Sequence, residues 1–196
     1  LTIVDCTASG EGENYTAGTV TGATKSAFNL TGTASLTVYD GVFSGNRYAD
    51  KTGYGGVILM NQASGTVTVK GGMFRDNYAD YGGAIYMDSR TNEVQLTVEN
   101  AYFTGNGGYH TGAIHFQYKV NASFKDTTIT GNTITGANSA GIYTTNAAAK
   151  ITFSGKMVVS GNTNSMASGK EINRNMILGV AAIKLNIDQL TSGSDI

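Results

Sequence analysis

Three aspartates in two similar loops are the residues of this sequence that could most simply do chemistry. Asp50 lies four residues after Asn46, Asp80 lies three residues after Asn77, and Asp76 directly precedes that second asparagine. Two carboxylates on one face can serve as the acid and the base of a glycoside hydrolase, and stacked carboxylates can hold a cation. Charged loop residues are more commonly solvated, so we expect these side chains to lie in solvent.

Tyrosine and histidine rings recur at two further sets of positions that could bind a ligand. One set lies in loops, and the other directly follows a recurring isoleucine, where a strand would point it outward. The candidate ligand-binding residues are Tyr54, Tyr81 and Tyr109 in the loops and Tyr86, His115 and Tyr143 after the isoleucines. A row of exposed rings suits stacking on sugars or docking of another protein. The alternative is that the rings pack on one another and cover the base of the loops.

The thiol and imidazole groups of the chain offer neither a metal site nor an activated nucleophile. Cys6 is the single cysteine, so it can form neither an internal disulfide nor a thiolate metal site. His115 stands between tyrosines and has no second ligand with which to hold a metal. The sequence therefore predicts no metal, no cofactor and no catalytic residue.

The elements that position these side chains follow from a long repeat. Five asparagines each stand three residues after a large apolar residue, at intervals of 31, 29, 26 and 30. The asparagines are Asn46, Asn77, Asn106, Asn132 and Asn162, and their apolar partners are Phe43, Phe74, Phe103, Ile129 and Val159. A period of this size indicates a repeat architecture, in which each unit buries its apolar face by stacking on the next.

One repeat reads as three short strands joined by turns. In residues 67–95, Val67–Val69 alternates apolar and polar side chains, Met73–Phe74 is a second strand, and Gly83–Met87 is a third. A helical pattern of the length that an α/β solenoid needs is missing from the repeat. The sequence thus predicts an all-β fold, a parallel β-helix (solenoid) of about six coils with three short strands per coil.

Stacking at the ~4.8 Å spacing of neighbouring strands places equivalent residues of successive coils above one another. We therefore expect Phe43, Phe74 and Phe103 to form an inward column. The recurring asparagines should lie at bends, because asparagine tolerates left-handed backbone geometry and its amide can bond both the backbone and the asparagine of the next coil. We expect a structural role for this column.

One β-helix domain, 1–196, accounts for the whole sequence. Residues 1–35 read as a degenerate first coil, 36–162 as the regular repeats, and 163–196 as divergent C-terminal coils, of which residues 170–196 lose the asparagine and the paired glycines. The chain opens on Leu1 without a signal-peptide pattern. We interpret it as a monomeric piece of a larger mature protein.

Composition argues against two classes of partner. The net charge is −1, only 14% of residues are charged, and the basic residues form no stripe with interleaved aromatics, so nucleic acid is a poor candidate. No apolar run approaches the ~20 residues of a membrane span. The 27 glycines fit a chain that turns often.

The two recurring signatures resemble the repeats of the polymorphic outer-membrane proteins of chlamydiae, which are autotransporter adhesins. Those repeats carry Phe-x-x-Asn and Gly-Gly-Ala followed by an aliphatic residue. Phe43–Asn46, Phe74–Asn77 and Phe103–Asn106 match the first signature, and Gly82–Ile85 matches the second. Similar motifs occur in large secreted β-helix proteins described as adhesin-like. The resemblance covers residues 36–162 and implies a right-handed parallel β-helix on a cell surface, without a catalytic residue.

These observations together predict a non-enzymatic, extracellular, adhesin-like β-helix segment that presents a rigid surface to a glycan or a surface protein. Two alternatives stay open. Parallel β-helices also host polysaccharide lyases and glycoside hydrolases, so a carbohydrate-active module is the second interpretation. A structural spacer is the third.

Overall fold

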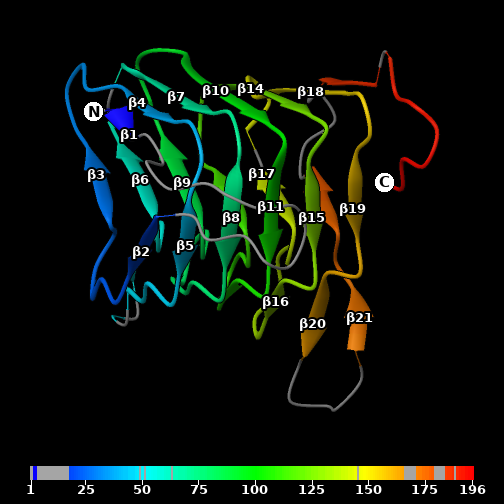
Figure 1. The fold of residues 1–196 in the computed structure, drawn as a ribbon, viewed down its shortest axis with the longest axis horizontal. Coiled ribbons are helices and arrows are strands. Elements are labelled where there is room, and N and C mark those ends of the chain that lie inside the picture. Colours follow the sequence, from blue (N-terminus) through cyan, green and yellow to red (C-terminus); the bar gives the residue numbers. More distant parts are fainter. Residues whose placement is uncertain are drawn as a thin grey trace.

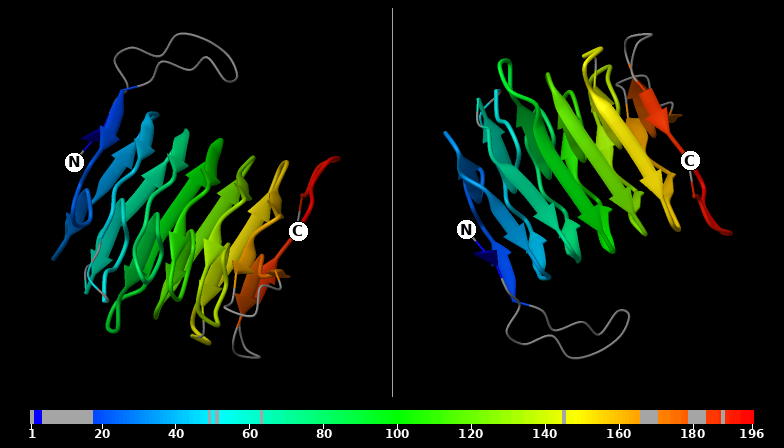
Figure 2. Two further views of the ribbon diagram at one scale, coloured as in Figure 1. Left: turned by 90° about the horizontal axis from the view of Figure 1, so that it is seen from below. Right: turned by 90° about the horizontal axis from the view of Figure 1, so that it is seen from above.

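The computed structural model describes residues 2–3, 18–48, 50, 52–62, 64–144, 146–165, 171–178, 184–187 and 189–196. Within these ranges the chain is all β and contains no helix. The strands wind into successive coils that stack from the N-terminal to the C-terminal side as a right-handed parallel β-helix (Figures 1 and 2). The predicted fold class is confirmed. Cys6 lies outside the described residues.

Three parallel sheets form the sides of the solenoid, and each coil contributes one strand to each sheet. The first sheet consists of β1 (Thr2–Ile3), β4 (Leu36–Val38), β7 (Thr66–Val69), β10 (Val94–Glu99), β14 (Val120–Lys125), β18 (Lys150–Ser154) and β23 (Lys184–Asn186). The second consists of β2 (Thr19–Thr21), β5 (Val42–Ser44), β8 (Gly72–Arg75), β11 (Ala101–Thr104), β15 (Thr128–Thr130) and β19 (Val158–Ser160). The third consists of β3 (Phe28–Leu30), β6 (Ile58–Asn61), β9 (Ile85–Asp88), β13 (Ile114–Phe116), β17 (Ile142–Thr144) and β22 (Met176–Leu178).

A short fourth sheet lies at the corner after the second sheet. It consists of β12 (Gly107–Gly108), β16 (Thr133–Ile134), β20 (Thr163–Ser165) and β21 (Glu171–Asn173). The pairing of β20 with β21 is antiparallel, whereas every other named strand pair is parallel. Figure 1 shows this pair extending beyond the edge of the neighbouring coils.

The period-two alternation of each strand decides which side chains enter the solenoid. Along β10, Val94, Leu96 and Val98 are buried, while the residues between them are half-buried. Parallel pairing then places each inward residue over its equivalent in the next coil, so that Leu96 lies between Val67 and Ala122. The result is one apolar core that runs the length of the stack.

The phenylalanine column lies inside the solenoid, as the sequence predicts. Phe43 and Phe74 are stacked with ring centroids 4.7 Å apart and an interplanar angle of 15°, and Phe74 and Phe103 are stacked at 4.7 Å and 11°. All three rings are fully buried. Ile129 and Val159 continue the column in the next two coils.

The five predicted asparagines form a buried ladder at the corner after the second sheet. Asn77 donates from Nδ2 to Oδ1 of Asn106 at 2.9 Å and to the carbonyl oxygen of Phe43 at 2.8 Å. Asn46 donates in the same way to Oδ1 of Asn77 at 3.0 Å. Each amide therefore ties one coil to the next, which confirms the structural role expected of this column.

The left-handed residue at this corner is the one before each asparagine, so the prediction of left-handed asparagines is wrong. The residues with positive φ are Gly45 (62°), Asp76 (56°), Gly105 (63°), Gly131 (64°) and Gly161 (64°). The turn is made one residue earlier because the asparagine must direct its side chain inward to reach the ladder. Glycine adopts such a φ without steric cost.

The C-terminal coils keep the ladder, contrary to the expectation that they lose the asparagine. Asn162 donates from its backbone nitrogen and from Nδ2 to Oδ1 of Asn175, at 3.0 and 3.2 Å. The β20–β21 pair separates these two asparagines in sequence, but β22 directly follows Asn175 and returns to the third sheet. At the other end, β1 pairs with β4 in parallel.

Candidate functional site

The candidate aromatic residues lie on the outward face of the third sheet and in the loops beside it. On β9 and β13 the isoleucine points into the core and the next residue points outward, which places Tyr86 beside His115. Tyr143 on β17 continues this outward column, and Leu59 on β6 precedes it. The sequence thus places these four positions correctly on one face.

Tyr86 and His115 are covered, so of the two arrangements considered for these rings the packed one is observed at both positions. Their exposed fractions are 5% and 1%. The loop ring Tyr54 packs on Tyr86 at 4.7 Å between centroids, and Tyr81 packs edge-on against His115 at 5.4 Å. The rings therefore pack on one another, and the loop tyrosines form the outer layer of a two-layered aromatic cluster.

The outer layer is shifted by one residue from the predicted loop column. Tyr54 stacks on Tyr81 at 5.1 Å, but the third member is His110, which stacks on Tyr81 at 4.3 Å. The predicted third member, Tyr109, is 49% exposed and meets His110 edge-on at 4.7 Å. Tyr81 pairs with Thr111 in the next coil, and the ring that stacks on Tyr81 comes from the residue before this threonine.

His115 is held in the inner layer by hydrogen bonds on both ring nitrogens. Nδ1 lies 2.8 Å from Oγ1 of Thr111, and Nε2 lies 2.9 Å from Oε1 of Gln117. Because an amide oxygen only accepts, Nε2 carries the hydrogen and the threonine hydroxyl donates to Nδ1. Burial lowers the pKa of His115 to about 4, with the Gln117 bond opposing this and His110 adding to it. The neutral ring is therefore a rigid part of the cluster.

A groove of about 370 Å³ opens beside the cluster. Its lining combines three tyrosine rings with amide, carboxyl and guanidinium groups: Tyr54, Tyr81, Tyr86, Asn61, Gln62, Asp88, Arg90 and Gln117. Asp88 lies two residues after Tyr86 on β9, so the two share the outward face, and Asp88 pairs with Asn61 on β6. The aromatic rings therefore lie beside a row of polar side chains, which come from positions two residues further along the strands of the third sheet.

Asp88 is the buried charge of this groove. It is 7% exposed; its Oδ2 accepts a hydrogen bond from Nε2 of Gln62 at 3.0 Å, and its Oδ1 is shielded from solvent without a hydrogen-bond partner. Burial raises the pKa of the Asp88 carboxyl, while Arg90 and the Gln62 bond act in the opposite direction. A buried carboxylate with an unfilled hydrogen-bonding site costs stability, which is typical of a group retained for binding.

The polar wall of the groove was not predicted, although the sequence carries a signal for it. Asn61, Asp88 and Gln117 each lie two residues after an outward residue of the third sheet. Period-two alternation therefore predicts that all three face outward beside the rings. Gln62 and Arg90 lie beyond the ends of the strands and reach the groove through their long side chains, so the alternation along a strand does not predict them.

Asp50 and Asp80 do not occupy equivalent positions in successive coils, contrary to the prediction from their loops. Arg47 pairs with Tyr78 and Tyr54 with Tyr81, so the earlier loop is longer and gives Asp50 no equivalent in the next coil. Asp50 lies in solvent as expected, 3.7 Å from Lys25, but Asp80 is buried, so the expectation of a solvated side chain is wrong for Asp80. Across the part of the chain that the structure describes, no three His, Cys, Asp or Glu side chains cluster as metal ligands would.

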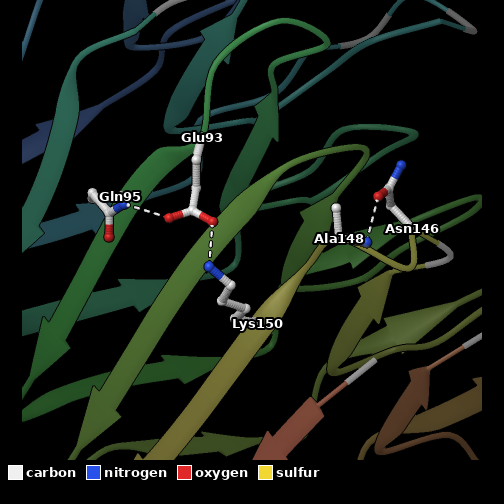
Figure 3. Close-up of polar contacts among 5 residues, drawn as sticks. All are labelled: Glu93, Gln95, Asn146, Ala148 and Lys150. Atoms are coloured by element: carbon white, nitrogen blue, oxygen red, sulfur yellow. Dashed lines mark hydrogen bonds and ion pairs between the residues drawn. The ribbon is translucent and has the colours of Figure 1, made fainter. Parts of the chain in front are cut away.

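Another polar cluster lies where the strands β10 and β18 of the first sheet begin (Figure 3). Lys150 donates to Oε2 of Glu93 at 2.7 Å across the intervening strand β14, and Gln95 donates to Oε1 of Glu93 at 3.2 Å. The Lys150 bond lowers the pKa of Glu93. Nearby, the amide nitrogen of Ala148 donates to Oδ1 of Asn146 at 2.8 Å and closes a local turn. These groups bond one another in solvent and line neither the groove beside Tyr86 nor the hollow at the C-terminal end, so we interpret them as surface structure.

A second hollow, of about 420 Å³, lies at the C-terminal end of the stack. It is lined by Val159, Asn173, Arg174, Asn175, Met176, Ile177 and Ile196. Among the described residues that line it there is neither an aromatic ring nor a carboxyl side chain, and it adjoins the last members of the inward columns. We regard it as the end of the core and place the candidate site at the groove beside Tyr86.

Within the described ranges, no helix has the length and apolar character that crossing a membrane requires. Comparison with protein-family models, with curated proteins and with solved structures finds no match to this chain.

Proposed function

We propose that this chain is a non-enzymatic segment of an extracellular, adhesin-like β-helix that binds glycan in the groove beside Tyr86. One observation carries the proposal: the groove joins a tyrosine wall to a row of amide, carboxyl and guanidinium side chains. A pyranose ring has apolar faces of C–H groups and a polar rim of hydroxyls. Tyrosine rings suit its faces, and fixed hydrogen-bonding groups suit its rim.

The rigidity of the groove supports binding of a flexible sugar chain. Tyr54, Tyr81 and Tyr86 contact one another, with centroid separations of 4.7 to 6.5 Å. The inner ring His115 is fixed by two hydrogen bonds. A wall that is already ordered loses little conformational entropy when a ligand arrives, and more of the contact energy then appears as affinity.

The make-up of the groove favours binding over turnover. Glycoside hydrolysis in most families needs two carboxyl groups, one as acid and one as base or nucleophile. Asp88 is the single carboxyl group among the described residues that line the groove. The extracellular setting is supported by the resemblance of the Phe-x-x-Asn and Gly-Gly-Ala repeats to surface adhesins.

An array of immobilised oligosaccharides tests this function. We expect the wild-type protein to bind a subset of glycans and to release no shortened or unsaturated product. Tyr54→Ala and Tyr81→Ala together should abolish that binding, because they remove the outer layer of the wall. Tyr102→Ala is the matched control, since this 53% exposed ring lies on β11 of the second sheet. Product release would show a carbohydrate-active enzyme, and absence of binding would leave the glycan proposal without support.

A further inference from the structure

The position of Asp88 determines what a sugar in the groove must present to it. Tyr86 and Asp88 leave the same strand on the same face, so a ring that packs on the tyrosine wall brings its rim toward the carboxyl group. Oδ2 of that carboxyl accepts a bond from Gln62 at 3.0 Å, whereas Oδ1 has no partner and is shielded from solvent, so a sugar hydroxyl reaches it only when a side chain at the rim of the groove turns aside. Oδ1 of Asp88 therefore lacks a hydrogen-bond donor, and a hydroxyl group of the sugar can donate to it.

We propose that Asp88 is the specificity-determining residue of the groove and selects uncharged sugars, by accepting a hydrogen bond from a pyranose hydroxyl and repelling uronic acids. This inference rests on the glycan-binding function proposed above. A hydroxyl completes the hydrogen bonding of the buried carboxylate, whereas the carboxylate of a uronic acid would place a second negative charge beside it. Like charges in a poorly solvated site are unfavourable for both groups.

Arg90 is the cationic group of the groove lining and could be expected to attract an acidic sugar. Its guanidinium lies over the ring of Tyr118, 5.1 Å from the centroid, and the residue is exposed. An exposed charge is screened by solvent and contributes little to pairing. Asp88 is buried, so its repulsion of a second carboxylate is screened much less. The balance therefore favours uncharged sugars.

A matched glycan set tests the inference directly. The probes are hexasaccharides of glucose, galactose and mannose, together with hexasaccharides of the corresponding uronic acids. Wild-type protein should bind at least one uncharged hexasaccharide about tenfold or more tightly than its uronic counterpart. Asp88→Asn should weaken binding of the uncharged sugar by about tenfold to a hundredfold, which is the effect of losing a hydrogen bond to a charged group. The same variant should bind the uronic counterpart more tightly than wild type does.

The gain of uronic-acid binding is a result that an unfolded variant cannot give. Asp50→Asn is the matched control, because it removes an exposed carboxylate outside the groove and should change neither affinity. The selection by Asp88 is overturned if the wild type prefers uronic acids. It is also overturned if Asp88→Asn binds the uncharged and the uronic hexasaccharides with wild-type affinities. In those two cases binding that still depends on Tyr54 and Tyr81 would keep the proposed function. If wild type binds no member of the set, both the function and the inference fail.

Discussion

Oδ1 of Asn106 accepts two hydrogen bonds from Asn77, one from its backbone nitrogen at 3.2 Å and one from its Nδ2 at 2.9 Å. The same two-bond pattern links Asn106 to Asn132 and Asn132 to Asn162. Each asparagine thus accepts from the preceding coil and donates to the next. Removal of one member breaks bonds on both sides, which makes the ladder a sensitive place to test the fold.

Asn77→Ala should lower the free energy of unfolding by about 3 kcal/mol, because both nitrogens of Asn46 lose their acceptor in a buried corner, and Oδ1 of Asn106 and the carbonyl oxygen of Phe43 each lose the bond from Nδ2. Urea unfolding followed by circular dichroism measures this. Glycan binding should persist at low temperature, since the ladder and the groove lie on different sheets. Loss of binding at unchanged stability would instead give the ladder a functional role.

Phe74→Ala should cost about 3–5 kcal/mol, because it removes a fully buried ring that stacks on both Phe43 and Phe103 and leaves a cavity between them. The same urea titration reports the loss. Tyr102→Ala, which truncates an exposed ring on the neighbouring strand, should change stability by less than about 0.5 kcal/mol. Equal losses in the two variants would contradict the observed inward column.

Stability should fall as pH drops from about 6.5, the ordinary histidine value, to about 4, the folded pKa of His115. In that window the unfolded chain binds the proton and the folded chain does not, so acid favours unfolding. The difference in pKa corresponds to about 3 kcal/mol. Comparison of wild type with His115→Gln at pH 7 and pH 4.5 isolates the effect from that of the carboxyl groups, including Asp88. The same acid loss in both proteins would show that the ring is accessible to protons.

Asp88→Asn should fold at least as stably as wild type at pH 7, with a gain of up to about 1 kcal/mol. The asparagine oxygen can keep the bond from Gln62, and the variant removes a buried charge with one unfilled acceptor. Thermal and urea unfolding measure the change. A variant that gains stability while losing sugar affinity identifies a residue retained for binding, whereas a large loss of stability would make Asp88 a structural group.

The repeat allowed the sequence to predict the fold closely, and the reason is visible at Leu96. Its neighbours in the stack, Val67 and Ala122, lie one period away in sequence, so a periodic pattern is enough to place them. Asn175 shows where this reasoning fails. It follows Asn162 by 13 residues, and only the antiparallel pairing of β20 with β21 returns the chain so that the ladder can continue.

The candidate site was predicted less well because loops decide it. Spacing alone gave Tyr109 as the partner of Tyr81, but Tyr81 pairs with Thr111, and the ring that stacks on it is that of His110. A shift of one residue in a loop has no periodic signature. The burial of Tyr86 by Tyr54 likewise depends on how a loop folds back over a strand, and a strand pattern gives only the direction of the side chain.

The junction between neighbouring coils carries an evolutionary consequence. The strands β10 and β11 present to β14 and β15 a surface that closely matches the one that β7 and β8 present to them. The inward columns, the asparagine ladder and the parallel strand pairing all continue through both junctions. Deletion or duplication of one whole unit by recombination would rejoin compatible surfaces. Such a gene can change length in steps of a coil and alter the reach of its product, and the groove stays intact when the unit lies outside the coils of β6, β9 and β13.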